Sequence, residues 1–228
     1  MAAPMPGRDV EADARRVYDC VVDGGIAIIH LDVAYAVLAH TADAVRRFYE
    51  AKRRSYNKPT GILGNHRLHE ELHLLSDQQR EMVRTITRDY DLPLAVIAPF
   101  RKNHPLIARM DPFVATQAVK GDTLNILLNA GTLRTAIADL AIGNGKLFVG
   151  TSANTSLAGS RYRLDDIEPD VRSIADLEID YGPSKYANPL GLSSTMIDFS
   201  TYRVQRAGVC FEEISNVMER RFGITLHK

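Results

Sequence analysis

The chain alternates segments with helical and with strand-like spacing of apolar residues. Apolar positions three and four residues apart are typical of amphipathic helices, whereas short apolar runs between turn residues indicate buried strands. The predicted helices cover residues 10–22, 41–54, 67–74, 76–90, 133–142 and 211–222, with a further polar helix after Leu164. The predicted strands cover residues 25–30, 60–63, 94–100, 123–128, 146–150, 177–181, 194–199 and 203–206.

This interleaved order predicts an α/β (α+β) fold with helices on the faces of a sheet. Several strands follow one another closely after residue 177, which favours an open, twisted mixed sheet over a purely parallel one. No linker rich in proline, glycine or serine and no internal repeat interrupts the pattern. We therefore expect one domain over residues 9–228, preceded by a flexible N-terminus at residues 1–8.

Composition and charge exclude several classes of protein. With 45% apolar and 25% charged residues, the 228-residue chain has the composition of an ordinary globular protein. Its 28 basic residues balance 28 acidic ones, so no global positive field recruits nucleic acid. The longest apolar runs fall far short of the roughly 20 residues that cross a bilayer, and we expect no membrane contact. Cys20 and Cys210 form no paired motif, which fits a cytoplasmic protein.

The end of one predicted helix is unusually cationic. Lys52, Arg53, Arg54 and Lys58 fall within seven positions. Cations there complement the negative end of the helix dipole, and this structural interpretation is favoured for the segment taken alone. The chain also passes from a helix into a strand at this point, where cationic side chains can converge on a polyphosphate. Phosphate binding is therefore the functional interpretation.

Two later segments offer hydroxyl and amide groups. Ser152 and Asn154 follow an apolar strand and could present donors to phosphate or carboxylate, or form an ordinary turn. Ser194 and Thr195 fit a strand with its hydroxyls on the approach side of a site, or a polar sheet edge.

Three histidines share one face of a predicted helix. His66, His69 and His73 are three and four residues apart beside Glu70, and such a face can hold a metal ion. Histidines on a charged helix more often face solvent, so we predict no metal site here.

In this order and spacing, the polar segments resemble the YrdC-like domain family, best known as threonylcarbamoyl-AMP synthases. The resemblance spans roughly residues 10 to 210. The matching positions are Lys52 and Arg54 (K-x-R), residues 152–154 (S-A-N), Ser194, Thr195 and Asp198 (S-T-V/I-V/I-D) and residues 206–208 (R-P-G, with Ala207 for proline). Residues 30–37 stand where the family has P-T-D/E-T-V-Y-G-L, and they keep Asp32 and Tyr35.

The resemblance implies a large concave cavity and a defined reaction. L-Threonine and bicarbonate form a carbamate, which attacks the α-phosphate of ATP, and the threonylcarbamoyl-AMP product serves tRNA modification. Mg²⁺ accompanies the ATP. Lys52 and Arg54 would be catalytic, with Lys58 also meeting the phosphates. The remaining positions implied to bind nucleotide or substrate are Asp32, Tyr35, Ser152, Asn154, Ser194, Thr195 and Arg206.

The chain departs from the family pattern at several of these places. Leu31 and Val33 replace two threonines, and Ala36 replaces a glycine. Residues 125–128 contain no arginine where the family strand has one, and residues 90–93 lack the family's G-P-x-T. Lost hydroxyl and guanidinium donors predict a more apolar cavity in which threonine is a poor substrate.

Two alternatives therefore stand beside the synthase. One is a carbamoyl- or acyl-adenylate enzyme that acts on another small amine, which the altered early motif favours. The other is a non-catalytic module that binds nucleotide or RNA, including tRNA or double-stranded RNA, through the retained cations.

Overall fold

The computed structural model describes residues 8–227. The predicted flexible N-terminus at residues 1–8 lies outside the described residues except for Arg8. The Arg8 guanidinium donates to the carbonyl oxygen of Tyr181 and lies 4.7 Å from the centroid of the Tyr181 ring. The described chain is therefore held against the fold from its first residue.

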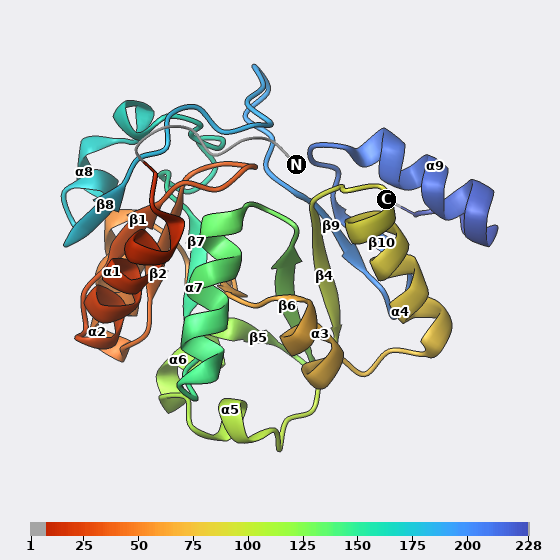
Figure 1. Cartoon of the computed structure of the whole chain (residues 1–228), viewed down its shortest axis with the longest axis horizontal. Helices are drawn as coiled ribbons and strands as arrows, with labels where there is room; N and C mark the ends of the chain where they lie inside the picture. The colour runs from red at the N-terminus through yellow and green to blue at the C-terminus, as the bar shows by residue number, and fades with distance from the viewer. Residues whose placement is uncertain (1–7, 228) are drawn as a thin grey trace.

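A mixed sheet forms the centre of the molecule (Figure 1). Within residues 8–227 its strands follow the order β10-β9-β4-β6-β3-β7-β2-β1-β8, and β5 pairs with β6 beside this path. The pairs β1–β8, β3–β6 and β4–β9 are parallel, and the other pairs are antiparallel. This confirms the predicted open mixed sheet. The strands are β1 (Ala27–Ile29), β2 (Ala36–Ala39), β3 (Gly61–Ile62), β4 (Leu94–Pro99), β5 (Val119–Lys120), β6 (Thr123–Leu128), β7 (Val149–Ser152), β8 (Leu177–Ile179), β9 (Thr195–Asp198) and β10 (Arg203–Arg206).

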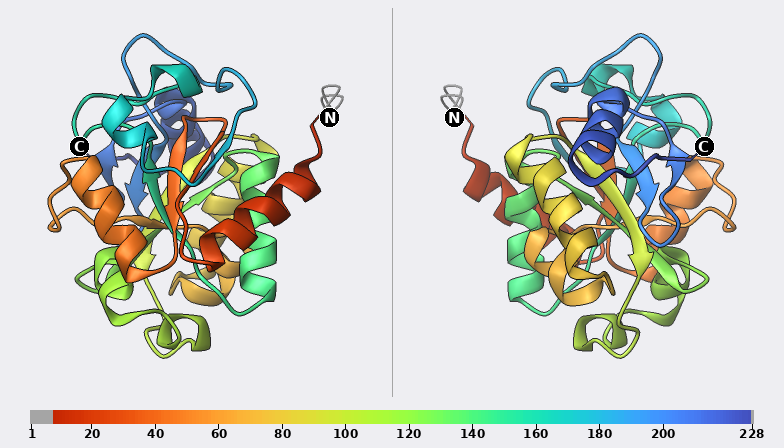
Figure 2. Two further views of the ribbon diagram at one scale, coloured as in Figure 1. Left: turned by 90° about the vertical axis from the view of Figure 1, so that its left-hand side faces the viewer. Right: turned by 90° about the vertical axis from the view of Figure 1, so that its right-hand side faces the viewer.

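Helices cover both faces of the sheet. In Figure 2, α1 and α7 lie together with α3 and α4 on one face, and α2 and α6 lie on the other. The helices are α1 (Val10–Val22), α2 (Ala42–Ala51), α3 (His66–Leu72), α4 (Asp77–Arg84), α5 (Pro105–Ala108), α6 (Pro112–Ala118), α7 (Thr132–Gly143), α8 (Pro169–Arg172) and α9 (Phe211–Phe222), with a π-helical turn at Thr85–Asp89 and a 3₁₀ turn at Leu164–Asp166. No helix in this part of the chain is long and apolar enough to span a membrane.

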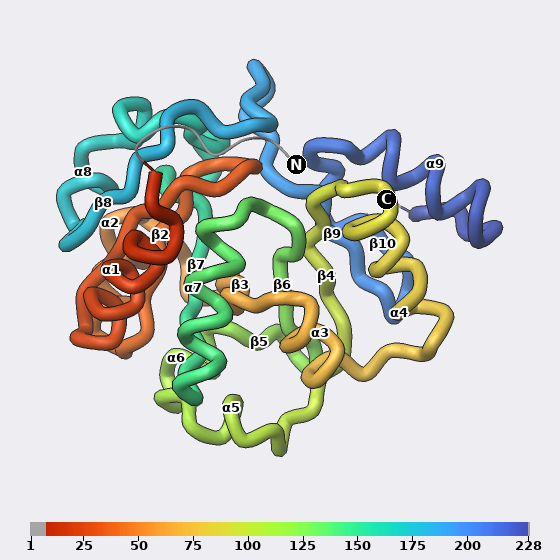
Figure 3. Tube along the Cα trace, viewed as in Figure 1, coloured from red at the N-terminus to blue at the C-terminus, as the bar shows by residue number. Residues whose placement is uncertain are grey.

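One long connection, between β8 and β9, brings distant segments to the same end of the sheet. β8 lies at one edge of the sheet, and β9 lies beside the strand at the opposite edge. The chain between them crosses over that end of the sheet, as the Cα trace shows (Figure 3). It delivers residues 193 and 194 close to the ends of β2 and β7, where polar residues of the other segments also lie.

Several elements differ from the prediction. The structure adds β2, β5, α5 and α6, and it places β7 at Val149–Ser152 rather than at 146–150. Residues 33–39 are an unbroken apolar run, buried throughout, in which neither alternation nor a turn residue marks the start of β2. The short α5 and α6 begin at Pro105 and Pro112, whose fixed φ suits the first helical turn.

Two of the three histidines on the predicted face are buried rather than solvent-facing, and His66 is half-buried. His69 and His73 are 2% and 0% exposed, and their Nδ1 atoms lie 2.8 Å apart. One ring must donate and the other accept, so the accepting ring is unprotonated at Nδ1. Burial and Arg80 lower the pKa of His69 to about 3. Within residues 8–227, no group of three metal-ligating side chains is placed to hold a metal ion.

Candidate nucleotide site

A cavity of about 190 Å³ lies where the three predicted polar segments meet. It sits around β3, which has only two residues and pairs with β6 at a single position, Ile62 with Ile126. Residues of β6 and β7 therefore line the cavity from both sides of this short strand. Its polar lining residues are Tyr35, Arg54, Asn125, Arg134, Thr151, Ser152, Ser193, Ser194 and Arg206.

Two predicted cations line the cavity. Arg54 donates through Nη2 to the carbonyl oxygen of Pro59 at 2.6 Å and through Nε to that of Lys58 at 3.3 Å. Arg206 donates through Nε to the carbonyl oxygen of Ser194 at 2.9 Å and through Nη2 to its Oγ at 3.0 Å. Desolvation and the neighbouring Arg54 lower the pKa of Arg206. Neither guanidinium has a carboxylate partner within the described chain, so this part of the cavity is suited to an anion.

Lys52 belongs to the same region but does not line the cavity. Its side chain is 1% exposed, and its Nζ donates to the carbonyl oxygens of Ser152, at 2.5 Å, and Asn154. Its own carbonyl oxygen accepts from the backbone N–H of Ser156 at 2.9 Å. Desolvation and Arg54 lower the pKa of Lys52 to about 7. The hydrogen bonds of Lys52 thus hold the end of α2 against the segment that follows β7.

The turn at the end of α2 separates the two predicted catalytic cations. Thr41 caps the start of this helix, and Arg53 follows its end with a left-handed φ of 50°. Lys52 and Arg54 therefore leave the backbone in different directions, one into the protein and one to the cavity. Lys58 is exposed and contributes only its carbonyl oxygen to this region, as an acceptor from Tyr49 and Arg54.

The predicted hydroxyl and amide residues divide between cavity and core. Ser152 and Ser194 line the cavity, whereas Asn154 is buried and donates through Nδ2 to the carbonyl oxygen of Thr155 at 2.6 Å. Thr195 is fully buried, and its Oγ1 bonds Gly208 and Val209 at 3.1 and 2.9 Å. Adjacent residues of a strand point to opposite faces, so Ser194 and Thr195 cannot both face the site as predicted.

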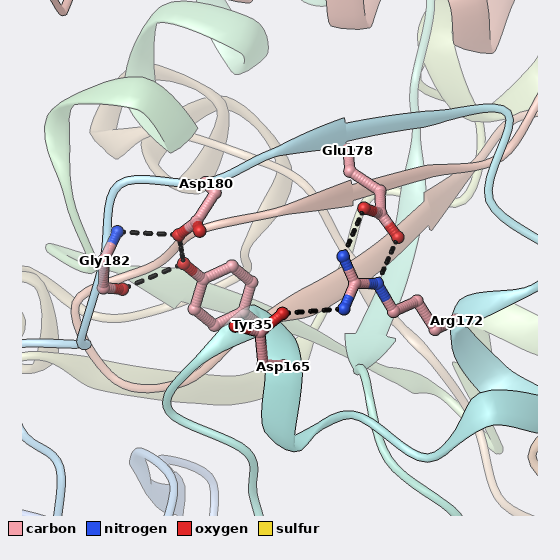
Figure 4. Close-up of polar contacts among 6 residues, drawn as sticks. All are labelled: Tyr35, Asp165, Arg172, Glu178, Asp180 and Gly182. Atoms are coloured by element: carbon pink, nitrogen blue, oxygen red, sulfur yellow. Dashed lines mark hydrogen bonds and ion pairs between the residues drawn. The ribbon is translucent and has the colours of Figure 1, made fainter.

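Asp32 and Tyr35, the two polar residues kept from the family pattern at residues 30–37, lie in different surroundings. Tyr35 lines the cavity, but its hydroxyl lies within hydrogen-bonding distance of the Asp180 carboxylate and, at 2.8 Å, of the Gly182 carbonyl oxygen (Figure 4). Desolvation and Asp180 raise the pKa of Tyr35. Asp32 is not among the lining residues. Its backbone N–H donates to the carbonyl oxygen of Ala130 at 2.9 Å, and burial raises the pKa of its carboxyl.

A guanidinium network supports the loop that carries Asp180. Arg172 bonds both oxygens of Glu178, at 2.8 and 3.0 Å, and Asp165 at 2.9 Å (Figure 4). These carboxylates raise the pKa of Arg172. The network holds β8 and the preceding loop together beside the Tyr35 contact.

Residues at positions where the chain departs from the family pattern line the cavity. Leu31 and Val33 are both lining residues, and Leu127 stands on the cavity side of β6. Along β6 the residues alternate between partly exposed and buried, so Asn125 and Leu127 share one face. The Oδ1 of Asn125 is buried and has no donor within residues 8–227.

Sequence reasoning missed Asn125 and Arg134 as lining residues. Strand alternation could have found Asn125, which shares a face with Leu127. Arg134 had a signal too, because it stands three and four residues before Ile137 and Ala138, on the apolar face of α7. A charged residue on the buried face of a helix marks either an ion pair or a binding site.

The lining does not fit a magnesium ion held by the protein. Mg²⁺ favours carboxylate oxygens, and no aspartate or glutamate lines the cavity within the described chain.

The chain belongs to the Sua5/YciO/YrdC family. The family model, described as telomere recombination, matches residues 19–208. This match includes the K-x-R, S-A-N and S-T segments that surround the cavity. Among curated proteins, none matches the chain.

Solved structures share the fold at low sequence identity. P. abyssi Sua5 complexed with L-threonine is 22% identical with a TM-score of 0.70, over 96% of this chain and 60% of that protein. A hypothetical protein from Streptococcus mutans is 17% identical with a TM-score of 0.77, over 94% and 93% of the two chains. E. coli YciO is 14% identical with a TM-score of 0.58, over 82% and 84%. The chain thus spans about 60% of the length of the Sua5 protein that it matches.

Proposed function

We propose that the chain is an ATP-dependent carbamoyl-adenylate synthase that acts on an amino acid or another small amine, in the manner of a threonylcarbamoyl-AMP synthase. The observation that carries this proposal is the convergence of Arg54, Arg206, Ser152 and Ser194 on one cavity in a member of this family. The L-threonine complex of the P. abyssi relative supports a small amine as the second substrate. Use of the product in tRNA modification is part of the same proposal.

The proposed reaction has two steps. The amine nitrogen bonds the carbon of bicarbonate, and loss of water leaves a carbamate. A carbamate oxygen then attacks the α-phosphorus of ATP, the α–β phosphoanhydride bond breaks, and pyrophosphate departs with the bonding electrons. Arg54 and Arg206 would screen the negative charge of the phosphates during this attack, while the hydroxyls of Ser152 and Ser194 donate to them. The surrounding apolar walls would keep water from the carbamate.

Pyrophosphate release tests the proposal. The protein is incubated with ATP, bicarbonate and a panel of amino acids and simple amines, with each component omitted in turn. We expect release that needs bicarbonate and an amine, and that is lost in Arg54→Met and Arg206→Met. Arg53→Met is the matched control, because Arg53 is exposed and pairs with Asp170 at 3.3 Å outside the cavity. Nucleotide binding with no release for any amine would instead favour a non-catalytic module.

A further inference from the structure

The cavity holds more positive charge than its predicted cations supply. Three arginines line it, namely Arg54, Arg134 and Arg206, and no carboxylate does so within residues 8–227. Arg54 and Arg206 come from the K-x-R segment and from β10. Arg134 comes from a third element, the first turn of α7. The site therefore has a cation that none of the predicted segments accounts for.

Arg134 is deeply buried and lacks a counter-ion. Its side chain is 4% exposed, and Nη1 donates to the carbonyl oxygen of Gly64 at 2.6 Å. Within the described chain, Nε and Nη2 have no hydrogen-bond acceptor, and no carboxylate forms an ion pair with the guanidinium. Burial lowers the pKa of Arg134 to about 9, so it remains charged at neutral pH. A buried cation without a partner is costly to the fold unless a ligand neutralises it.

The backbone fixes where this guanidinium can go. Gly131 precedes α7 with φ of 118°, and a Cβ there would lie 3.0 Å from the Asp32 carboxylate. This tight turn after β6 starts α7 beside the cavity, so its third residue reaches the lining. The backbone thus holds the Arg134 side chain at the cavity, and Arg134 is not a mobile surface residue.

The other lining groups define the rest of the ligand. Leu31, Val33, Leu63 and Leu127 present aliphatic carbon to the cavity. Asn125 adds a polar residue to this lining, but its unpaired Oδ1 is itself buried. Together with Arg134 the aliphatic groups match a ligand with an anionic head and an aliphatic body.

We propose that Arg134 binds the carboxylate of an aliphatic amino acid, and that valine-like side chains are preferred to threonine as the amine substrate. This rests on the proposed function and names its substrate class. A guanidinium binds a carboxylate with paired hydrogen bonds, which fixes the orientation of the amino acid. Valine and threonine have nearly the same shape, but the threonine hydroxyl would lose its bonds to water against Leu31 and Val33. The discrimination expected from such an apolar pocket is about 10- to 100-fold.

Calorimetry on the full chain tests the proposal. Valine, threonine and valinamide are titrated with and without a non-hydrolysable ATP analogue, after binding of the analogue has been measured alone. We expect valine to bind at least about 10-fold more tightly than threonine, because the pocket is apolar. Valinamide, which lacks the carboxylate, should bind at least about 10-fold more weakly than valine, as expected for a lost charge-assisted bond.

Variants of Arg134 then test whether its guanidinium contacts the carboxylate of valine. Arg134→Gln should lose about 10-fold or more in valine affinity and keep its affinity for the nucleotide analogue. Arg134→Lys keeps the charge and should show an intermediate loss, which provides the test if the glutamine variant does not fold. Arg80→Gln is the matched control, since Arg80 also donates to backbone carbonyl oxygens, those of Glu70 and His73, but does not line the cavity.

Two results would overturn the assignment. One is equal or tighter binding of threonine or valinamide to the unmodified protein, and the other is full valine affinity in a folded Arg134 variant. Failure of the nucleotide analogue to bind, with valine binding intact and dependent on Arg134, would count against the proposed function alone.

Discussion

The buried Lys52 should make the stability of the fold rise with pH above neutrality. Desolvation and Arg54 lower the pKa of Lys52 from 10.5 to about 7 in the folded chain. Between these two values the unfolded chain binds a proton that the folded chain does not, so raising the pH favours folding. At pH values below 7 the amine is charged in both states, and its contribution no longer changes.

The size of this effect follows from the two pKa values. With 10.5 for the unfolded and about 7 for the folded chain, raising the pH from about 7 to about 8.5 adds roughly 1.5 kcal/mol to the free energy of unfolding. The measurement is chemical denaturation of the unmodified protein and of Lys52→Met over this pH range. The free energy of unfolding of the unmodified protein should rise by this amount relative to that of Lys52→Met. It should not rise relative to that of Lys102→Met, which removes an exposed lysine.

A constant difference across this pH range would refute the reasoning. It would mean that the two carbonyl oxygens bonded to Nζ keep Lys52 charged in spite of its burial. Loss of nucleotide affinity in Lys52→Met with unchanged stability would show that the lysine meets phosphate directly.

Three further predictions concern the cavity and the core. Arg54→Ala and Arg206→Ala should each weaken ATP binding by roughly 1.5–3 kcal/mol, less at high salt, in calorimetric titrations, and unchanged affinity would leave these cations a structural role only. Thr195→Val should lower the free energy of unfolding by about 1–3 kcal/mol by removing the bonds to Gly208 and Val209, while Ser194→Ala should chiefly weaken nucleotide binding. His69 has a folded pKa of about 3, so the unfolded chain takes up the proton first as the pH falls below 6.5. Its contribution should lower the stability at pH 5 by about 2 kcal/mol relative to neutral pH, so His69→Asn should lose about that much less than the unmodified protein, and equal losses in the two denaturation series would contradict this.

The alternation of apolar segments predicted the mixed sheet because most strands are buried runs with clear turn residues at their ends. β2 was not predicted because residues 33–39 contain no polar or turn residue that marks where the strand begins. β3 was predicted as four residues and has two, since its length depends on how β6 and β7 are placed on either side of it. Local sequence contains no information on that placement.

The candidate site was predicted in its segments but not in the direction of its side chains. The K-x-R spacing gives no sign that Arg53 adopts a left-handed conformation, which directs Lys52 inward and Arg54 to the cavity. Strand geometry, in contrast, could have separated Ser194 from Thr195, because neighbours on a strand face opposite ways. The sequence marks Arg134 as a charged residue on the apolar face of α7, but only the packing of α7 shows that this face borders a cavity.

A crystal structure of the chain with a non-hydrolysable ATP analogue would test most directly whether the cavity is a nucleotide site. We predict that the phosphates lie between Arg54 and Arg206, within hydrogen-bonding distance of the Ser152 and Ser194 hydroxyls, and that Lys52 keeps its bonds to the carbonyl oxygens of Ser152 and Asn154. Nucleotide bound elsewhere on the protein, or phosphates remote from both guanidinium groups, would contradict the assignment.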